Sequence, residues 1–519
     1  MFFKEKKMSI SEIGILIAII AYMVGIIGIG LYYAKKSNTS GDFYLGGRKL
    51  GPFVTAMSAE ASDMSSWLLM GLPGVAYLTG ICDAFWTAVG LAIGTYVNWL
   101  IVAKRLRKYT VVSGNAITIP DFFANRFRDK IALKTVSALI IIIFFVPYTA
   151  SGFVACGNLF ESLFDIPYIT AMVLSAVVIV AYTTLGGFLA ASTSDFIQSI
   201  VMTVALAIVL IYGIISVGGV DQVAQNVSGL AGYIDLNAMY DATTNSATDY
   251  SVLSIFSTLA WGLGYFGMPH VLLRFMAIEN PEKIKLSRRI ASTWVVISMA
   301  IAILIGVIGY SMSTNNVIGE FGSFDSETVI VQIAHVLSNN GILFAIMAGV
   351  ILAGILASTM STSDSQLLAA SSSVTENLVG GVFNVRLSEK RKVIIARLSV
   401  IIISLIAMVL ALNPNSSVFE IVSFAWAGFG ATFGPVMLFA LFWKRSNRWG
   451  ALAGMISGGI VVFVWKFLIR PLGGIVNIYE LLPAFLVACF FIVLVSLLTP
   501  APSEEIVKEF ETVKSSNGK

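Results

Sequence analysis

The sequence predicts an all-α protein that crosses a membrane many times. Of its 519 residues, 57% are apolar and only 12% are charged, which is too little polar surface for a large soluble protein. Mean hydropathy is +0.87. Many apolar runs reach the length of about 20 residues that a helix needs to cross a bilayer core of about 30 Å. The short alternating segments of a transmembrane β-barrel do not match this pattern.

The apolar runs predict thirteen membrane helices. The first, at about 10–33, is too long for a secretory signal and lacks a cleavage site of small residues. The others are expected at about 51–80, 83–103, 133–158, 167–186, 194–217, 251–277, 290–313, 341–371, 393–412, 417–443, 449–469 and 479–499.

Lysine and arginine are distributed unevenly between the two membrane faces. If the N-terminus lies outside, 28 of the 33 fall on the cytoplasmic side and five outside. Because positive residues are retained in the cytoplasm, we expect the N-terminus outside and the C-terminus inside. Every one of these residues falls in a loop or within a turn or two of a helix end. No fixed cation is therefore expected near the middle of the membrane.

The second predicted helix carries polar residues that a lipid-facing helix would not tolerate. Its segment 58–74, SAEASDMSSWLLMGLPG, contains Glu60, Asp63 and a Gly-Leu-Pro-Gly stretch that predicts a break. An Asp at the bilayer centre costs about 2.5–3.5 kcal/mol, so both carboxylates are candidates for a binding site. A mobile cation, a proton or a hydrogen-bond cage remains as the partner of Asp63. Glu60 is either a second titratable group or a peripheral residue paired with a loop.

The seventh predicted helix is also interrupted. Gly262, Gly264, Gly267 and Pro269 weaken its hydrogen-bond ladder. It lies five helices after the other broken helix, so the two cross the membrane in opposite directions. Such a pair indicates inverted repeats with a binding site between them; alternatively, the glycines only allow close helix packing. The predicted parts are helix 1 with the first cytoplasmic loop (1–50), a first repeat (51–218), an extracellular loop (219–250), a second repeat (251–443), helices 12 and 13 (444–499) and a cytoplasmic tail (500–519).

A third polar stretch, STMSTSDSQ at 358–366, lies in the ninth predicted helix. Most of Ser358, Ser361, Thr362 and Ser365 share one helix face. A face of neutral oxygens suits a small hard cation, particularly beside carbonyls freed by a broken helix. The alternative is that these hydroxyls only bond back to their own helix.

Other functional classes find little support in the sequence. Cys82, Cys156 and Cys489 are scattered through apolar sequence and are expected to be unpaired. His270 and His335 lack the spacing of metal ligands. No nucleophile and base are recognisable. We therefore expect no enzyme, no cofactor, no nucleic-acid partner and no obligate protein partner.

The motifs LGGRKLGPFVTAMSAEASDMSSWLLMGLPG, WGLGYFGMPH, MSTSDSQLL and FAWAGFGATFGP closely resemble the solute:sodium symporter family, from about Tyr44 to Pro500. The resemblance implies a leucine-transporter-like fold, with a five-plus-five inverted repeat, in the bacterial plasma membrane. It also implies import of L-proline driven by sodium. Another amino acid, pantothenate or a monocarboxylate remains an alternative cargo. A sensor built on this fold is disfavoured by a tail of only about twenty residues.

The resemblance also implies a sodium site and a substrate site. Asp63 would raise the cation affinity of a site formed by the carbonyls of Ala61, Met64 and Ser358 and the hydroxyls of Ser361 and Thr362. The substrate residues would be Ser65 and its neighbour Ser66 at the head group, and Tyr148, Trp261, Tyr265 and Pro269 around the ring. Aromatic walls suit an apolar ring, and the start of a half-helix suits a carboxylate. Core packing is the alternative for the aromatic residues.

Two further residues match the family near the cytoplasmic helix ends. Arg48 and Asp195 would act in gating or stabilisation, or would simply anchor helices at the interface. Two positions depart from the family pattern, because Ser66 and Glu60 replace glycines. Ser66 would narrow the substrate pocket or add a hydrogen bond, which bears on selectivity for proline.

Overall fold

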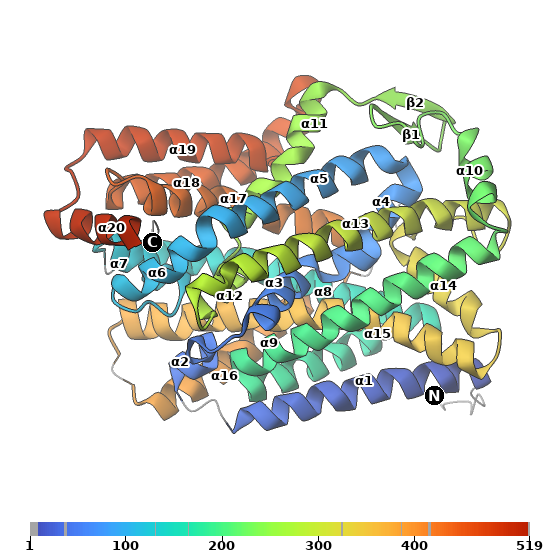
Figure 1. Ribbon diagram of the computed structural model, residues 1–519, viewed down its shortest axis with the longest axis horizontal. Helices are drawn as coiled ribbons and strands as arrows, with labels where there is room; N and C mark the ends of the chain where they lie inside the picture. The colour runs from blue at the N-terminus through green and yellow to red at the C-terminus, as the bar shows by residue number, and fades with distance from the viewer. Residues whose placement is uncertain are drawn as a thin grey trace.

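The computed structural model describes residues 9–35, 39–129, 131–164, 166–322, 325–385, 387–413 and 417–516. Lys4, Lys6, Lys7, Lys36, Lys130, Arg386 and Lys519, which entered the count of charges, lie outside these residues. The described part is a bundle of long helices that run roughly along one axis (Figure 1). The beginning of α1 and the helix α20 lie at opposite ends of this bundle.

Ten helices in the described ranges are long and apolar enough to cross a membrane, or up to eleven segments if one bent pair counts as a single span. The protein is thus a multi-pass helical membrane protein. The long helices are α1 (Ile10–Ala34), α5 (Ile81–Val97), α8 (Ala132–Phe164), α9 (Tyr168–Ser216), α13 (Ile284–Thr314), α15 (Ile342–Ser372), α16 (Glu389–Leu410), α17 (Val418–Phe442), α18 (Arg448–Val464) and α19 (Leu481–Leu498). Irregular helical turns extend several of them, at Asn98–Ala103, Pro281–Lys283, Ser373–Val382 and Trp465–Ile469.

Two segments consist of short helices joined end to end. The first contains α3 (Pro52–Ser66), a π-helical turn (Trp67–Gly71) and α4 (Leu72–Thr79). The second contains α11 (Val252–Leu259), a 3₁₀ helix (Ala260–Phe266) and α12 (Pro269–Ala277), and it bends by 45°. These are the two helices that the sequence predicts to be broken. Both pack at the centre of the bundle, where α3 contacts α9, α12, α13 and α15.

The prediction of a loop at 187–193 is wrong. Helix α9 runs through these residues and includes both helices that the sequence predicts at 167–186 and 194–217. Its backbone leaves the helical conformation only at Gly187, which has φ 64°. Glycine adopts this conformation without the strain that a side chain would add, so the chain turns at one residue and needs no loop.

The connecting segments contain more secondary structure than the sequence predicts. They hold α2 (Ser40–Leu45), α6 (Lys104–Val112), α7 (Ile119–Phe127), α10 (Val220–Ser228), α14 (Val329–Ser338), α20 (Glu504–Ser516) and short 3₁₀ turns at Gly46–Arg48, Ser326–Thr328, Arg470–Leu472 and Gly474–Val476. Strands β1 (Ala238–Asp241) and β2 (Ser246–Asp249) form an antiparallel hairpin in which Ala238 pairs with Asp249. The β1–β2 hairpin and α10 lie at the same end of the bundle (Figure 1).

The glycines of the second broken segment pack closely against other helices. A Cβ on Gly262 would lie 2.2 Å from the carbonyl oxygen of Gly90 in α5. A Cβ on Gly264 would lie 1.9 Å from Nε1 of Trp426 in α17. The segment is therefore bent, as predicted, and is also tightly packed, while the inverted repeats stay a prediction.

Gly264→Ala is expected to destabilise the protein. The new methyl group would overlap the buried indole of Trp426, and overpacking of this kind costs about 1–3 kcal/mol or more. The midpoint of thermal unfolding of the purified protein measures the effect. Gly28→Ala in α1 is the matched control, because nothing lies within 4 Å of its Cβ position. Equal midpoints for the two variants would contradict the prediction.

Candidate functional site

The break in the first segment lies at Ser65. This residue has φ 51° and ψ −170°, which interrupts the helix between α3 and the π-helical turn. The backbone N–H of Trp67 donates a hydrogen bond to Ser65 Oγ at 3.1 Å, which caps the new turn. The Gly-Leu-Pro-Gly stretch at 71–74 remains helical, because Pro73 stands in the first turn of α4, where no backbone donor is needed. The prediction of a break is confirmed, but its predicted position in this stretch is wrong.

Four of the five predicted sodium ligands form one connected set. Ser361 Oγ, on α15, donates a hydrogen bond to the Ala61 carbonyl of α3 at 2.8 Å. The hydroxyls of Ser361 and Thr362 each lie 3.1 Å from the Ser358 carbonyl. The fifth ligand, the carbonyl of Met64, accepts the N–H of Trp67 just beyond the break. The broken helix and the hydroxyl-bearing face of α15 are therefore in direct contact.

Asp63 lies beside this contact and keeps one carboxylate oxygen without a partner. Its Oδ2 accepts a hydrogen bond from the hydroxyl of Tyr265 at 2.5 Å. Its backbone carbonyl accepts one from the hydroxyl of Tyr148 at 3.4 Å. Oδ1 is buried and has no hydrogen-bond partner within the described chain. A buried ionised carboxylate needs compensation, so Oδ1 marks a place where a cation or another donor would be stabilised.

A narrow cavity of about 10 Å³, enough for about one water molecule, lies next to Asp63. Its walls are aromatic and apolar apart from Asp63, a lining that suits a small, partly apolar molecule, but they must move apart before such a molecule can enter. The lining residues are Asp63, Met64, Trp67, Leu91, Tyr148, Trp261, Val422 and Trp426. Tyr148 and Trp261 were predicted to line a substrate site, and Tyr265 contacts Trp426 edge-on with 5.0 Å between ring centroids.

The other predicted substrate residues, Ser65, Ser66 and Pro269, do not line the cavity. Ser65 and Ser66 are buried at the break, and the hydroxyl of Ser65 is taken up by capping. Pro269 is buried at the first position of α12. The predicted roles of these residues in binding, including the effect of Ser66 on the size of the substrate pocket, stay predictions.

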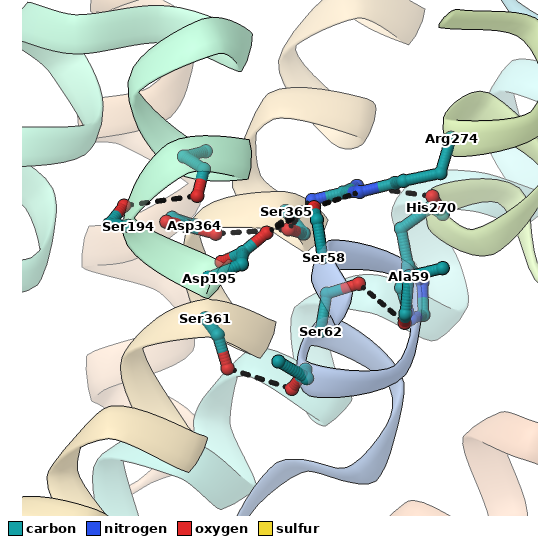
Figure 2. A network of polar contacts seen from close by, with 12 residues as sticks. Ser58, Ala59, Ser62, Ser194, Asp195, His270, Arg274, Ser361, Asp364 and Ser365 are labelled. Carbon is teal, nitrogen blue, oxygen red and sulfur yellow. Dashed lines mark hydrogen bonds and ion pairs between the residues drawn. The ribbon is translucent and has the colours of Figure 1, made fainter. Parts of the chain in front are cut away.

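A buried ion pair lies on the α12 side of the site (Figure 2). Arg274, on α12, is 1% exposed and its Nη2 lies 3.0 Å from Asp195 Oδ2. Arg274 also donates hydrogen bonds to the hydroxyls of Ser58 and Ser365. Arg274 is therefore a buried cation, but it lies in the last turn of α12, so the expectation that no fixed cation lies near the middle of the membrane stays a prediction. Arg274 pairs with Asp195, however, and leaves Asp63 without a cationic partner among the described ion pairs.

The two residues predicted to act in gating both connect helices. Asp195, on α9, accepts hydrogen bonds from Ser58 and Arg274. Arg48 donates to the carbonyls of Met276, at 2.6 Å, and Ala116, at 2.7 Å, and thus ties α12 to the α6–α7 connection. Burial, with a smaller effect of nearby Arg107, lowers the pKa of Arg48 to about 10, so Arg48 stays charged at neutral pH.

Glu60 is not a peripheral residue paired with a loop. It is 1% exposed, and its Oε1 accepts a hydrogen bond from Nε1 of Trp99 at 2.9 Å. Its Oε2 is buried without a partner in the described chain. Glu60 therefore adds a second carboxylate to the interior, one turn before Asp63.

Sequence reasoning missed several residues of this region. Trp67 and Trp426 line the cavity. Both are aromatic residues within motifs that resemble the family, and this could have indicated a place in the substrate site. Asp364 accepts a hydrogen bond from the hydroxyl of Tyr182 at 2.7 Å, and no local pattern indicates this contact.

Comparisons with known proteins identify the family. The family model "Sodium:solute symporter family" matches residues 43–458. The osmoregulated proline transporter OpuE of Bacillus subtilis is 42% identical over 502 residues, which cover 96% of this chain and 98% of the relative. The sodium/proline symporter 2 of Staphylococcus saprophyticus is 41% identical and covers 96% of this chain and 95% of the relative. A sodium/proline symporter of Staphylococcus aureus is 40% identical and also covers 96% of this chain and 95% of the relative.

Solved structures share the fold. A sodium-coupled sialic acid symporter, in a substrate-bound outward-open state, superposes with a TM-score of 0.77 at 16% identity, over 95% of this chain and 99% of that chain. MhsT in complex with L-phenylalanine gives 0.54 at 12% identity, over 86% of this chain and 98% of that chain. The family model spans most of the helical bundle, and these relatives span nearly the whole chain. The chain belongs to the sodium:solute symporter family.

Proposed function

We propose that the protein is a secondary active symporter that imports L-proline together with sodium. The observation that carries this proposal is the contact between Ser361 Oγ and the Ala61 carbonyl, which joins α15 to the broken helix beside Asp63. Relatives at 40–42% identity are named as proline transporters or sodium/proline symporters. On this proposal the protein acts as a transporter and not as an enzyme, and sodium is its coupling ion rather than a resident cofactor.

Sodium would bind between α3 and α15. The proposed ligands are the carbonyls of Ala61, Met64 and Ser358 and the hydroxyls of Ser361 and Thr362. Sodium is a hard cation that prefers such oxygens, and its arrival would replace hydrogen bonds that the hydroxyls now donate. The unpaired Oδ1 of Asp63 supplies the compensating negative charge, directly or through a hydrogen-bonded shell.

Proline would bind in the aromatic cavity beside this site, once its walls have moved apart to make room. Tyr148 and Trp261 would enclose the pyrrolidine ring, and Tyr265 would support that wall through Trp426. Pro269 is proposed as a further substrate residue on the resemblance alone. The ring is apolar and suits aromatic neighbours. Its carboxylate would lie near Ser65 and Ser66, where backbone N–H groups follow the helix break and favour an anion.

We also propose thirteen spans with the N-terminus outside and the C-terminus in the cytoplasm of a bacterium. Helix α9 has the length of two spans and changes direction at Gly187, and α3 to α4 together have the length of one. Thirteen spans result when the bent pair, the second half of α9 and the α3 to α4 segment are each added to the ten long helices. Helices 2–6 and 7–11 would form the two inverted repeats, and the distribution of Lys and Arg supports the orientation.

Sodium is expected to bind first and to order the cavity, so that proline affinity rises with sodium. Thermodynamic linkage then requires proline to raise the affinity for sodium by the same factor. Uptake of labelled proline into proteoliposomes, with and without an inward sodium gradient, tests the proposal. Competition by other amino acids, pantothenate and monocarboxylates tests the cargo. Equal uptake with sodium and potassium gradients would overturn the proposed coupling.

Ser361→Ala is expected to raise the sodium concentration for half-maximal uptake by about tenfold. The change removes one ion ligand and the link to Ala61, and a hydrogen bond to a charged group contributes about 1.5–3 kcal/mol. Sodium dependence of uptake at saturating proline measures the effect. Ser372→Ala, on the same helix and also buried, is the control, because its hydroxyl bonds back to the Ala369 carbonyl of its own helix. An unchanged sodium dependence would remove α15 from the site.

A further inference from the structure

The turn before α19 reaches the aromatic wall of the cavity. Tyr479 is 6% exposed and its ring stacks on that of Trp261, with 5.0 Å between centroids and an interplanar angle of 21°. Trp261 lines the cavity, whereas Tyr479 does not. Tyr479 therefore lies behind the wall, in contact with the ring that faces the solute.

Hydrogen bonds fix Tyr479 in this place at both ends. Its backbone N–H donates to Ser257 Oγ of α11 at 2.7 Å, and its hydroxyl donates to the carbonyl of Ser423 in α17 at 2.7 Å. One residue thus joins the broken second segment to α17. Both of these elements contribute cavity-lining residues, Trp261 from the first and Trp426 from the second.

An ion-pair cluster holds the turn itself. Glu480, the next residue, is fully buried and lies 3.0 Å from Nη1 of Arg470 and 3.8 Å from Nζ of Lys466. These contacts join the end of α18 to the start of α19. A buried carboxylate with two cationic neighbours is costly to displace, so the position of Tyr479 is set by both helices.

We propose that Tyr479 is a positioning residue of the solute site, which acts by holding the Trp261 indole against the bound solute. The proposal rests on the proposed function, because it assigns the cavity to the transported molecule. It gives the α18–α19 pair, which lies outside both proposed repeats, a direct part in solute affinity. Sodium affinity should depend little on Tyr479, because its contacts lie on the Trp261 side of the cavity.

A double-mutant cycle tests whether Tyr479 acts through Trp261. Tyr479→Ala is expected to raise the KM for proline by about fivefold to tenfold, in the upper part of the range for losing one aromatic pair, with kcat and the sodium half-saturation within about twofold of the parent. Trp261→Ala should raise the KM at least as much. Tyr479→Ala added to Trp261→Ala should raise it no further, because the mediating ring is gone.

Conservative variants separate positioning from general stability. Tyr479→Phe keeps the stacked ring and should keep the KM within about twofold of the parent. Tyr240→Ala in β1 is the matched control, since Tyr240 is also 6% exposed and packs against other tyrosines away from the cavity, and its KM should not change. If Tyr479→Ala lowers the amount of folded protein, Tyr479→Leu replaces it in the cycle with the same expectations.

Two results would overturn the proposal in distinguishable ways. Trp261→Ala is expected to weaken proline affinity. If it does so, but Tyr479→Ala weakens proline affinity additively or not at all, the role of Tyr479 alone is overturned. Proline transport unaffected by Trp261→Ala would overturn the proposed solute site together with this inference.

Discussion

Asp63→Asn is expected to raise the sodium half-saturation of proline uptake by at least about 100-fold. The amide keeps the shape of the side chain and still accepts the hydrogen bond from Tyr265, so folding should be preserved. What is lost is the negative charge on Oδ1, which has no hydrogen-bond partner in the described chain. Removing one partner of a buried charge pair costs about 3–5 kcal/mol, and each 1.4 kcal/mol is tenfold in affinity.

Uptake into proteoliposomes as a function of sodium concentration measures this loss. The midpoint of thermal unfolding in sodium-free buffer confirms that the variant is folded. Glu282→Gln is the matched control, because Glu282 is an exposed carboxylate paired with Lys104 in a connecting segment, and its replacement should leave uptake unchanged. Sodium-stimulated uptake that persists in Asp63→Asn with a normal half-saturation would remove Asp63 from the coupling site.

The sequence predicts those parts of the site whose cost in a bilayer is visible locally. Glu60 and Asp63 stand in an otherwise apolar segment, and burying such carboxylates is too costly to occur without a compensating environment. The hydroxyls of Ser361 and Thr362 also stand in a largely apolar helix, where polar groups need a compensating environment. These residues and the resemblance together predicted a contact between two helices that are 300 residues apart along the chain, and the structure brings them within hydrogen-bond distance.

Features that depend on exact helix positions were not predictable from the sequence. The helix break falls at Ser65 because that residue adopts a left-handed conformation, which serine rarely does and no motif indicates. Gly187 replaces a whole loop by one turn, so the length of the connection was overestimated. Arg274 was counted with the loop charges because it lies near the end of its helix. Its partner Asp195 is 79 residues away, and that pairing is set by tertiary packing.

Arg274→Met is expected to lower the free energy of unfolding by about 3–5 kcal/mol, because it leaves the buried carboxylate of Asp195 without its cation. Methionine preserves much of the volume, so a cavity contributes little to this loss. The yield of folded protein and the midpoint of thermal unfolding measure it. Lys283→Met is the matched control, since the exposed pair of Lys283 and Glu279 should contribute less than about 1 kcal/mol.

A second variant separates the charge from the packing of Arg274. Adding Asp195→Asn to Arg274→Met should restore part of the lost stability, because the double variant no longer buries that uncompensated charge. Arg274 joins α12 to α3, α9 and α15 through Ser58, Asp195 and Ser365. Any movement that opens the bundle at this point must break these contacts. The double variant should therefore favour an opening of the bundle beside α12. Unchanged solvent accessibility of the residues around α12 would show that the ion pair stabilises the fold without controlling access.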